Sequence, residues 1–386
     1  MKIVTGQFND SYLPIMDGVA NVAKNYAYWL NKKSVDSYVI TPSFPNYIDD
    51  ESFEVIRYFS MPIPQRPPYR LGITEFDLPF KRKINEIPFD IVHAHCPFTS
   101  GKFALRLARK RHIPIVATFH SKYYDDFKEA VKFDYAAKFM VNRTINFFNQ
   151  VDFVWTVNDA TVETLRKYGF KGKIDVVPNG TDFVPPKNRD ELFNMVNKKL
   201  NITDTEIVFL FVGQLIWQKN LALIINSLSS LKGMGINFKV IFASEGFAEN
   251  ELREMAANKG IYDDVIFTGK ILDREYLKAL FIRADLFLFP SLYDTSGIVV
   301  QEAAAVKCPS LLVEGSNAAQ NIINGYNGFL SEDNEKAYAE EIKHILSDRG
   351  KLPNVGHNAY DTLYTSWDKI VDEVRMRYIE IVKHYK

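Results

Sequence analysis

Short apolar segments of strand length alternate with helical patterns along the 386 residues of the chain, and this alternation constrains the fold most. It is typical of parallel α/β sheets, in which each helix carries the chain back to begin the next strand. The chain becomes turn-rich over 179–186, and the alternation then starts again. The pattern therefore predicts two doubly wound domains, each with ligand sites at the carboxyl ends of its strands.

The expected elements follow from the apolar runs and their periodicity. In the first half, strands are expected over 2–6, 37–41, 53–59, 91–93, 115–118, 153–157 and 175–177, and helices over 19–31, 102–111 and within 125–150. In the second half, strands are expected over 208–213, 238–243, 264–268, 286–290 and 310–313, and helices over 221–232, 249–259, 273–283 and 297–306. The last segment, 361–386, has apolar residues near helical spacing and predicts an amphipathic helix.

Composition excludes several classes of protein. Hydrophobic residues make up 47% of the chain and the formal net charge is zero, so no bulk positive field favours a nucleic-acid partner. The two cysteines, Cys96 and Cys308, lack metal-ligand spacing and fit a reducing compartment. No signal peptide or membrane-spanning run of roughly 18 residues is visible, so we expect a cytoplasmic protein, with a peripheral position on the inner face of the membrane left open.

One strand–turn–helix junction, residues 284–305, is suited to hold an anion. An apolar run meets a Pro-Ser pair and a polar turn, and a helical pattern follows. Thr295 or Ser296 is the expected N-cap of this helix. Free amides and the positive end of a helix together favour a phosphate. The amides expected to face the ligand belong to Ser296, Gly297 and Ile298.

Two carboxylates flank this junction, Asp294 in the turn and Glu302 inside the helix. An ordinary junction with two solvated acids is the alternative interpretation. The arrangement resembles the signature of the retaining glycosyltransferases of family 4, which is usually Glu-x7-Glu followed by Ala. In that family the first acid faces the sugar of a nucleotide-sugar donor, and the second holds the ribose hydroxyls. The resemblance thus implies a catalytic, sugar-facing Asp294, one methylene shorter than usual, and a ribose-binding Glu302.

Residues 212–220 resemble the Gly-Arg-Leu…Lys-Asn element of the same family, in which Arg and Lys grip the donor diphosphate. Gly213 and Lys219 match, and the charge of Lys219 would stabilise the departing diphosphate without a metal. Gln214 replaces the arginine, and a neutral amide supplies neither a charge nor a bidentate fork. Taken alone, Lys219 would be interpreted as a surface residue.

Histidines follow two strand-like segments of the first half. The His-Ala-His run at 93–95 and the Thr-Phe-His run ending at His120 resemble the membrane-lipid glucosyltransferase branch of the family. His120 then corresponds to the histidine beside the primary hydroxyl of the sugar, although a satisfied loop histidine is the alternative. No third metal ligand accompanies His93 and His95 at a sensible spacing. We therefore expect a structural His93 and a His95 that faces the cleft.

Other loops match the family in the right order. Gly18 opens the first helix in a segment similar to the family's Tyr-x-Pro-x-x-x-Gly-Val loop. Gly246 corresponds to a loop near the sugar phosphate, and Lys270 and Ile271 to a loop near the nucleobase. Residues 178–182 resemble the interdomain hinge. The dinucleotide motif Gly-x-Gly-x-x-Gly is absent, which argues against an NAD enzyme.

The resemblance implies a GT-B fold, with two Rossmann-like domains facing across a cleft. The acceptor-binding domain would cover 1–183 and the nucleotide-sugar-binding domain 184–360, with the helix of 361–386 packing back on the first. It also implies a retaining, metal-independent transfer of a hexose to an acceptor hydroxyl. The donor would be a nucleotide diphosphate sugar, UDP-linked in the first place, and no other cofactor is expected. The sugar, the base and the acceptor are not fixed by the sequence.

The acceptor could be a membrane lipid, a glycan or a small molecule. Up to Pro185, 24 Lys and Arg residues face 20 Asp and Glu residues, a weak positive bias that suits an anionic membrane surface. Alternatives are a nucleotide-sugar-binding protein with weak transfer activity, a GT-B phosphorylase and an epimerase. The candidate lipid-facing cations are Lys102, Arg106, Arg109, Lys110 and Arg111, although such a run is more often a solvated helix face.

Overall fold

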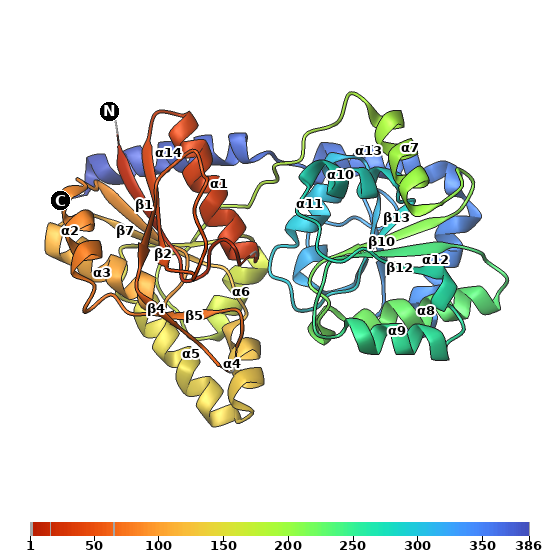
Figure 1. Ribbon diagram of the computed structural model, residues 1–386, viewed down its shortest axis with the longest axis horizontal. Coiled ribbons are helices and arrows are strands. Elements are labelled where there is room, and N and C mark those ends of the chain that lie inside the picture. The colour runs from red at the N-terminus through yellow and green to blue at the C-terminus, as the bar shows by residue number, and fades with distance from the viewer. Residues whose placement is uncertain (1–2, 16, 65, 386) are drawn as a thin grey trace. The chain divides into compact units, whose positions relative to one another are not determined.

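The computed structural model describes residues 3–15, 17–64 and 66–385 and divides the chain into two compact units (Figure 1). Unit 1 comprises Met1–Asn179 and Trp367–Lys386, and unit 2 comprises Gly180–Ser366. Each unit is built on a parallel sheet with helices on both faces, so the doubly wound α/β class is confirmed. Lys2, at the start of the expected strand 2–6, lies outside the described residues.

The sheet of unit 1 has the order β3-β2-β1-β6-β7-β8-β9, and its strands pair in parallel. The order reverses between β1 and β6, which makes the carboxyl ends of these strands the natural ligand site. The strands are β1 (Val4–Phe8), β2 (Asp36–Pro42), β3 (Val55–Tyr58), β6 (Ile91–Ala94), β7 (Ile115–Phe119), β8 (Phe153–Thr156) and β9 (Asp175–Val176). A small antiparallel hairpin, β4 (Ser60–Pro62) with β5 (Arg70–Gly72), was not predicted.

The helices of unit 1 correct one expectation. A helix lies within 125–150 as expected, but a separate, shorter one precedes it, because Lys132 adopts a left-handed conformation (φ 59°) and its amide ends that first helix on the Lys128 carbonyl. A second helix then begins at Asp134. The helices are α1 (Gly18–Lys32), α2 (Leu78–Glu86), α3 (Thr99–Arg111), α4 (Tyr123–Val131), α5 (Asp134–Phe148), α6 (Asp159–Lys167) and α14 (Trp367–His384).

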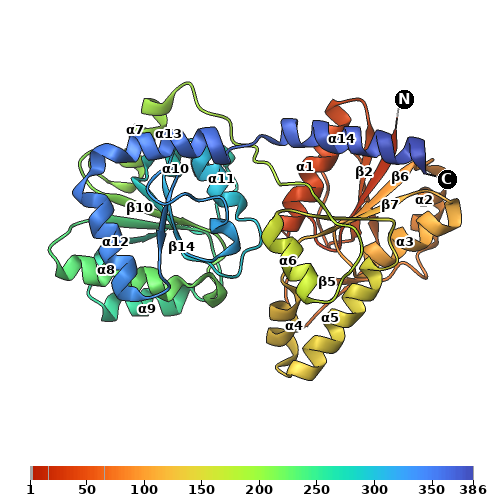
Figure 2. The same ribbon diagram turned by 180° about the vertical axis from the view of Figure 1, so that it is seen from behind.

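The last helix, α14, belongs to unit 1 and lies along α1 (Figure 2). Trp367 is fully buried with its ring edge-on to Tyr26, at 5.9 Å between centroids. Lys33 at the end of α1 pairs with Asp368 and Asp372 at 2.7 and 2.9 Å. The helix begins at residue 367 and not at 361, because residues 361–363 complete α13 of unit 2.

The sheet of unit 2 has the order β12-β11-β10-β13-β14-β15, again with parallel pairs. Its order reverses between β10 and β13, which are buried throughout and therefore read as continuous apolar runs. The strands are β10 (Val208–Val212), β11 (Lys239–Ala243), β12 (Val265–Phe267), β13 (Leu286–Phe289), β14 (Ser310–Val313) and β15 (Phe329–Ser331).

The helices of unit 2 cover both faces of this sheet. Of these, α7, α12 and α13 were not predicted. None of the helices in the described part of either unit is long and apolar enough to cross a membrane. The helices of unit 2 are α7 (Arg189–Leu200), α8 (Leu221–Gly233), α9 (Glu249–Asn258), α10 (Arg274–Arg283), α11 (Ile298–Ala305), α12 (Glu335–Ser347) and α13 (Leu352–Leu363).

Candidate active site

The loops that follow β10 and β13 meet at the switch point of unit 2. Lys219 lies in the short 3-10 helix η1 (Trp217–Lys219) after β10, and Asp294 lies in the turn after β13. The Lys219 ammonium donates a hydrogen bond to Asp294 Oδ1, and the two side chains are only 12% and 22% exposed. The residues that resemblance assigned to the diphosphate and to the sugar therefore form an ion pair with each other.

This ion pair leaves one acceptor unused. Asp294 Oδ2 is buried and has no hydrogen-bond partner among the described residues. A buried oxygen without a partner is costly, so such atoms are rare outside functional sites and water sites. Asp294 can therefore accept a hydrogen bond from a ligand hydroxyl while Lys219 is still bound to its other oxygen.

The N-terminus of α11 carries no side-chain cap. The expected N-cap at Thr295 or Ser296 is wrong, since Gly297 occupies this position in a left-handed conformation (φ 56°). Gly297 accepts from the Val300 amide at 2.8 Å, and α11 proper starts at Ile298. The helix end is thus still free to offer amides and its dipole to an anion. Ser296, half-buried in the turn, lies next to this end.

Gly297→Ala should lower the free energy of unfolding by about 2–4 kcal/mol. The left-handed conformation costs a residue with a Cβ about 1 kcal/mol. The new Cβ would also lie 2.7 Å from Ala318 Cβ, and such overpacking typically costs about 1–3 kcal/mol. Urea denaturation measures the loss. Gly235→Ala is the matched control in unit 2, because Gly235 also has a positive φ (81°) but no atom within 4 Å of the added Cβ. Equal losses of unfolding free energy in the two variants would contradict the predicted steric clash with Ala318.

The loop after β11 packs backbone to backbone on the loop after β10. A Cβ on Gly246 would lie 2.3 Å from the Leu215 carbonyl oxygen, so this glycine has a packing role in addition to the predicted ligand role. Gly213 has a positive φ (148°), and Gln214 beside it is exposed. The glutamine that replaces the family arginine is therefore open to solvent.

The loop after β12 carries the residues assigned to the nucleobase. Lys270 is exposed and lies 4.0 Å from Glu245 Oε1. Ile271 is half-buried and packs on the core of unit 2. The contact of this loop with a nucleobase stays a prediction.

Glu302 is buried and already bonded. Its carboxylate lies 2.6 Å from Arg274 Nη2, and the same guanidinium binds Asp182, with Nε 3.0 Å from Asp182 Oδ2. Burial raises the pKa of Glu302, although Arg274 opposes this shift. The sequence did not indicate Arg274, because a pairing between residues 28 positions apart leaves no local pattern. A ribose hydroxyl that bonds to Glu302 must share the carboxylate with Arg274.

Arg274→Ala should destabilise unit 2 by about 3 kcal/mol, because it leaves the buried Glu302 carboxylate without a partner. The loss should shrink as pH falls, since a buried acid with a raised pKa gains stability when it is protonated. Chemical denaturation at two pH values measures both effects. Adding Glu302→Gln to the variant should restore part of the stability. The surface pair of Arg253 and Glu249 supplies the control, and Arg253→Ala should cost below about 1 kcal/mol.

Three histidines of unit 1, His93, His95 and His120, form one buried group at the carboxyl ends of β6 and β7. His95 Nδ1 lies 3.2 Å from His120 Nε2, and His95 Nε2 lies 2.9 Å from Gln7 Oε1 in β1. His93 binds Tyr378 of α14 at 2.6 Å and Thr118 at 2.7 Å, as its expected structural role requires. His95, which was expected to face the cleft, is buried, with only 1% of its surface exposed.

Burial lowers the pKa of all three histidines. The pKa of His120 falls to about 3, and the pKa values of His93 and His95 lie well below 6.5 for the same reason. The three rings are therefore neutral at pH 7. Within the described part of the chain, no group of three or more His, Cys, Asp or Glu side chains is placed to hold a metal ion.

Two further expectations concern the surface of unit 1. Gly18 is exposed at the start of α1, and a Cβ there would meet no atom within 4 Å, so a ligand can approach this backbone. Met16, in the same loop, lies outside the described residues. The basic run of α3 is largely used inside the unit: Arg109 binds Asp152 at 2.8 Å, and Arg111 donates to the Ile84 carbonyl at 2.7 Å.

Of the other cations in this run, Arg106 pairs with Glu75 at 2.9 Å. Lys102 and Lys110 are exposed, and neither forms an ion pair with another described residue. The basic residues of α3 therefore mainly form contacts within unit 1, and only Lys102 and Lys110 would be available to a lipid surface.

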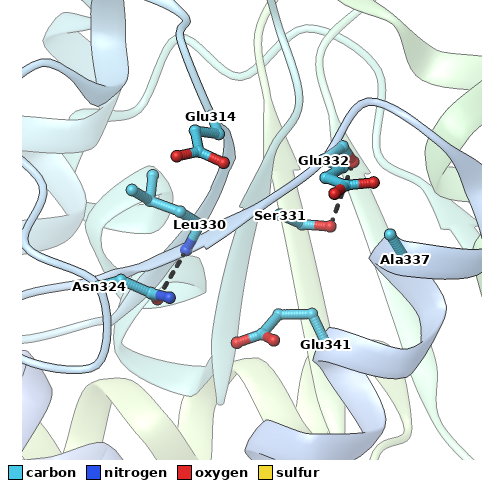
Figure 3. A pocket seen from close by; sticks show the side chains of 7 residues that line it. All are labelled: Glu314, Asn324, Leu330, Ser331, Glu332, Ala337 and Glu341. Atoms are coloured by element: carbon cyan, nitrogen blue, oxygen red, sulfur yellow. Dashed lines mark hydrogen bonds between the residues drawn. The ribbon is translucent and has the colours of Figure 1, made fainter.

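A cavity of about 330 Å³ lies between the ends of β14 and β15 and the start of α12, and neither Lys219 nor Asp294 lines it. Figure 3 shows its three carboxylates, Glu314, Glu332 and Glu341, around the opening. Three acids repel a diphosphate. This cavity is therefore not the candidate donor site, which stays at the β10–β13 switch point.

Comparison with known proteins agrees with these assignments of fold and class. The Glycosyltransferase Family 4 model matches residues 16–183, and the Glycosyl transferases group 1 model matches residues 194–362. The chain is 27% identical to the alpha-monoglucosyldiacylglycerol synthase of Streptococcus pneumoniae over 326 residues, which is 83% of this chain and 73% of that protein. It is 25% identical to the synthase of the same name from Acholeplasma laidlawii, with 88% and 87% covered.

A solved structure shares the fold at lower identity. The Anabaena protein HepE, in complex with UDP and glucose, superposes with a TM-score of 0.77 at 16% identity and covers 98% of this chain and 99% of its own. The two family models together span most of the chain, and the predicted GT-B architecture of two Rossmann-like units is confirmed. The chain therefore belongs to the glycosyltransferases of family 4 and is a hexosyltransferase.

Proposed function

We propose that this enzyme transfers a hexose from a UDP-sugar to the hydroxyl of a diacylglycerol-type membrane lipid, with retention at the anomeric carbon. The observation that carries the proposal is the meeting of Lys219, Asp294 and the uncapped end of α11 at the switch point of unit 2. The names of the two synthases support a lipid acceptor and glucose, and the HepE complex supports UDP. Unit 2 would bind the donor and unit 1 the acceptor.

In this proposal the donor diphosphate replaces Asp294 as the partner of the Lys219 ammonium. The phosphate oxygens would bind the ammonium and the amides of Gly297 and Ile298, and Asp294 would accept from a sugar hydroxyl. The bond from the anomeric carbon to the diphosphate then breaks, and a bond to the acceptor oxygen forms on the same face. The proton of the acceptor hydroxyl passes to the departing phosphate oxygen. Lys219 stabilises the charge that develops on that phosphate, with no metal or other cofactor.

The same proposal includes contact with the inner face of the membrane. Three aromatic side chains stand exposed where α4 meets α5, namely Phe133 (73%), Tyr135 (86%) and Phe139 (54%). Both ribbon views show α4 and α5 projecting from unit 1 (Figures 1 and 2). Exposed Lys132 and Lys138 alternate with these rings, and aromatic residues among lysines are typical of interfacial anchors. This tip supports a membrane contact better than α3 does.

The donor is tested first. Thermal shift against UDP-, GDP- and ADP-sugars should show stabilisation by UDP-glucose, and transfer of labelled glucose to diacylglycerol in mixed micelles should follow and survive EDTA. NMR of the product should show an α-linked sugar. Stabilisation by another base, a β-linked product or loss of transfer in EDTA would contradict the proposal.

Membrane contact is tested by flotation with vesicles that contain anionic lipid. The wild type should float, and the triple change of Phe133, Tyr135 and Phe139 to Ser should not. A matched change of the exposed pair Tyr262 and Met234 in unit 2 to Ser should leave flotation intact. Equal flotation of all three proteins would contradict the assignment of the α4–α5 tip.

A second function is favoured by the weak positive charge at the candidate donor site. Gln214 is exposed and neutral. Lys219, the only cation of the β10–β13 ion pair among the described residues, is neutralised by Asp294. This fits a protein that binds a nucleotide sugar but transfers it weakly. Stabilisation by the donor with no labelled product from any lipid, glycan or small-molecule acceptor would select this function.

A further inference from the structure

One guanidinium in unit 2 joins two carboxylates from separate segments of the chain. Arg274 Nε lies 3.0 Å from Asp182 Oδ2, and Nη2 donates to Asp182 Oδ1, so this contact is bidentate. Nη2 also donates to Glu302 Oε1 at 2.6 Å. Nε carries one hydrogen and Nη2 carries two, so these three hydrogen bonds use every hydrogen on this edge of the guanidinium. We call Asp182, Arg274 and Glu302 the arginine brace.

The face of the guanidinium is also fixed. Arg274 Cζ lies 4.4 Å from the centre of the ring of Phe183, which is buried, and this contact favours the cation. Asp182 and Phe183 directly follow Thr181, whose amide donates to the Thr365 carbonyl at 2.9 Å. The segment that begins unit 2 is therefore fixed in place and orients Arg274 by both its edge and its face.

The brace leaves one oxygen of Glu302 to a ligand. Arg274 is the only hydrogen-bond partner of this carboxylate among the described residues, and it binds Oε1, so Oε2 can accept another hydrogen bond. Burial raises the pKa of Glu302, whereas the charge of Arg274 lowers it and so favours the ionised form. Because an ionised carboxylate only accepts hydrogen bonds, the ligand must present a donor such as a hydroxyl.

The position of Glu302 indicates which hydroxyl this is. Glu302 lies in α11, about 7–8 Å along the helix axis from Gly297 at the proposed diphosphate site. In a UDP-sugar the diphosphate lies between two groups with hydroxyl donors, the hexose and the ribose. The proposed function places the hexose at Asp294, on the turn before α11, which leaves the ribose for a carboxylate inside the helix.

We propose that Arg274 and Asp182 are positioning residues that direct the Glu302 carboxylate at a hydroxyl of the donor ribose and so select a ribonucleotide over a deoxyribonucleotide. Asp182 acts through Arg274, because its bidentate contact orients the guanidinium. Lysine cannot replace this arginine, since it supplies a point charge on a flexible chain and no planar fork. The selection rests on the proposed function, in which unit 2 binds the UDP-sugar, whereas the geometry of the brace does not.

The selection is measured with UDP and its 2′-deoxy and 3′-deoxy analogues, by calorimetric titration of the full chain. We expect the wild type to bind UDP roughly tenfold more tightly than at least one analogue, because a hydrogen bond to a charged group contributes about that factor. Asp182→Asn and Arg274→Lys should each lower this ratio of Kd values by roughly threefold or more.

Asp182→Asn is the main variant, because Asp182 is exposed and its loss leaves no buried charge without a partner. Arg274→Lys serves if the first variant does not fold. Asp348→Asn is the matched control: it removes an acid from an exposed ion pair with Lys351 in unit 2 and should leave every Kd unchanged. A purely structural brace would weaken UDP and its analogues by the same factor, so an unchanged ratio in the variants would overturn the proposal.

A double-mutant cycle locates the effect at Glu302. Asp182→Asn should weaken the binding of UDP to the wild type but not to Glu302→Ala, and equal weakening in both backgrounds would overturn the proposal. The outcomes also separate this inference from the proposed function. The expected ratios without transfer to diacylglycerol would contradict the proposed function alone, and transfer with unchanged ratios would contradict the inference alone. A wild type that does not bind UDP would contradict both.

Discussion

Replacing Lys219 by alanine is expected to lower kcat/KM for sugar transfer by about 10²–10³-fold. Lys219 is the cation that meets the proposed diphosphate site, and one charge-stabilising donor in a low-dielectric site is worth about that much. Gln214 cannot compensate, because it is exposed and carries no charge. Steady-state transfer of labelled glucose from the donor measures the change.

The control for this variant is Lys343→Ala, which removes a lysine from an exposed ion pair and should leave turnover unchanged. Lys219→Ala also leaves Asp294 without its partner, so its fold must be checked by circular dichroism and thermal denaturation. The double variant with Asp294→Asn removes this unpaired charge. If it regains stability, the unpaired carboxylate causes the stability loss of Lys219→Ala; near-normal turnover in Lys219→Ala would defeat the assignment.

Unit 1 is expected to lose roughly 4 kcal/mol of stability between pH 7.5 and pH 5.5 through His93, His95 and His120. Burial lowers the pKa of each ring in the folded state, to about 3 for His120, whereas in the unfolded chain each titrates near 6.5. Below about pH 6.5 the unfolded chain therefore binds one more proton per histidine. Each histidine therefore lowers the free energy of unfolding by about 1.4 kcal/mol per pH unit, and this loss grows as pH falls.

Tryptophan fluorescence can follow this loss in unit 1 alone. Trp29, Trp155 and Trp367 lie in unit 1, so Trp217→Phe removes the signal of unit 2. Urea midpoints of this variant should fall steeply below pH 6.5. His120→Asn should reduce the pH slope by about one proton, whereas His357→Asn, at an exposed histidine, should not change it. A flat pH profile would show that the buried rings are already charged or accessible.

The central strands and the donor junction could be predicted because their signals are local. Parallel strands buried on both faces are continuous apolar runs, and the turn at Asp294 stands directly between such a run and a helix. The break between α4 and α5 could not be predicted, since nothing in the periodicity indicates that Lys132 takes a left-handed conformation. The prediction of an N-cap at Thr295 or Ser296 was wrong for a related reason. Gly297 packs against Ala318, and only the folded chain brings these two residues together.

Side-chain partners were the least predictable part of the site. Lys219 and Asp294 were assigned to different parts of a ligand, yet they bind each other because the loops after β10 and β13 converge. The link from Gln7 to His95 spans 88 positions and has no motif. Motifs locate the backbone of a site, whereas the hydrogen bonds within it depend on the sheet order.

The position of α14 has a consequence for how the protein is made. Residues 180–366 leave the ribosome between the two parts of unit 1, and Tyr26 and His93 have no Trp367 or Tyr378 beside them until the last segment emerges. The contiguous second unit can complete its core earlier. A message that stops shortly before codon 367 should thus yield a folded unit 2 joined to a unit 1 whose core is incomplete, which is a target for chaperones and proteases.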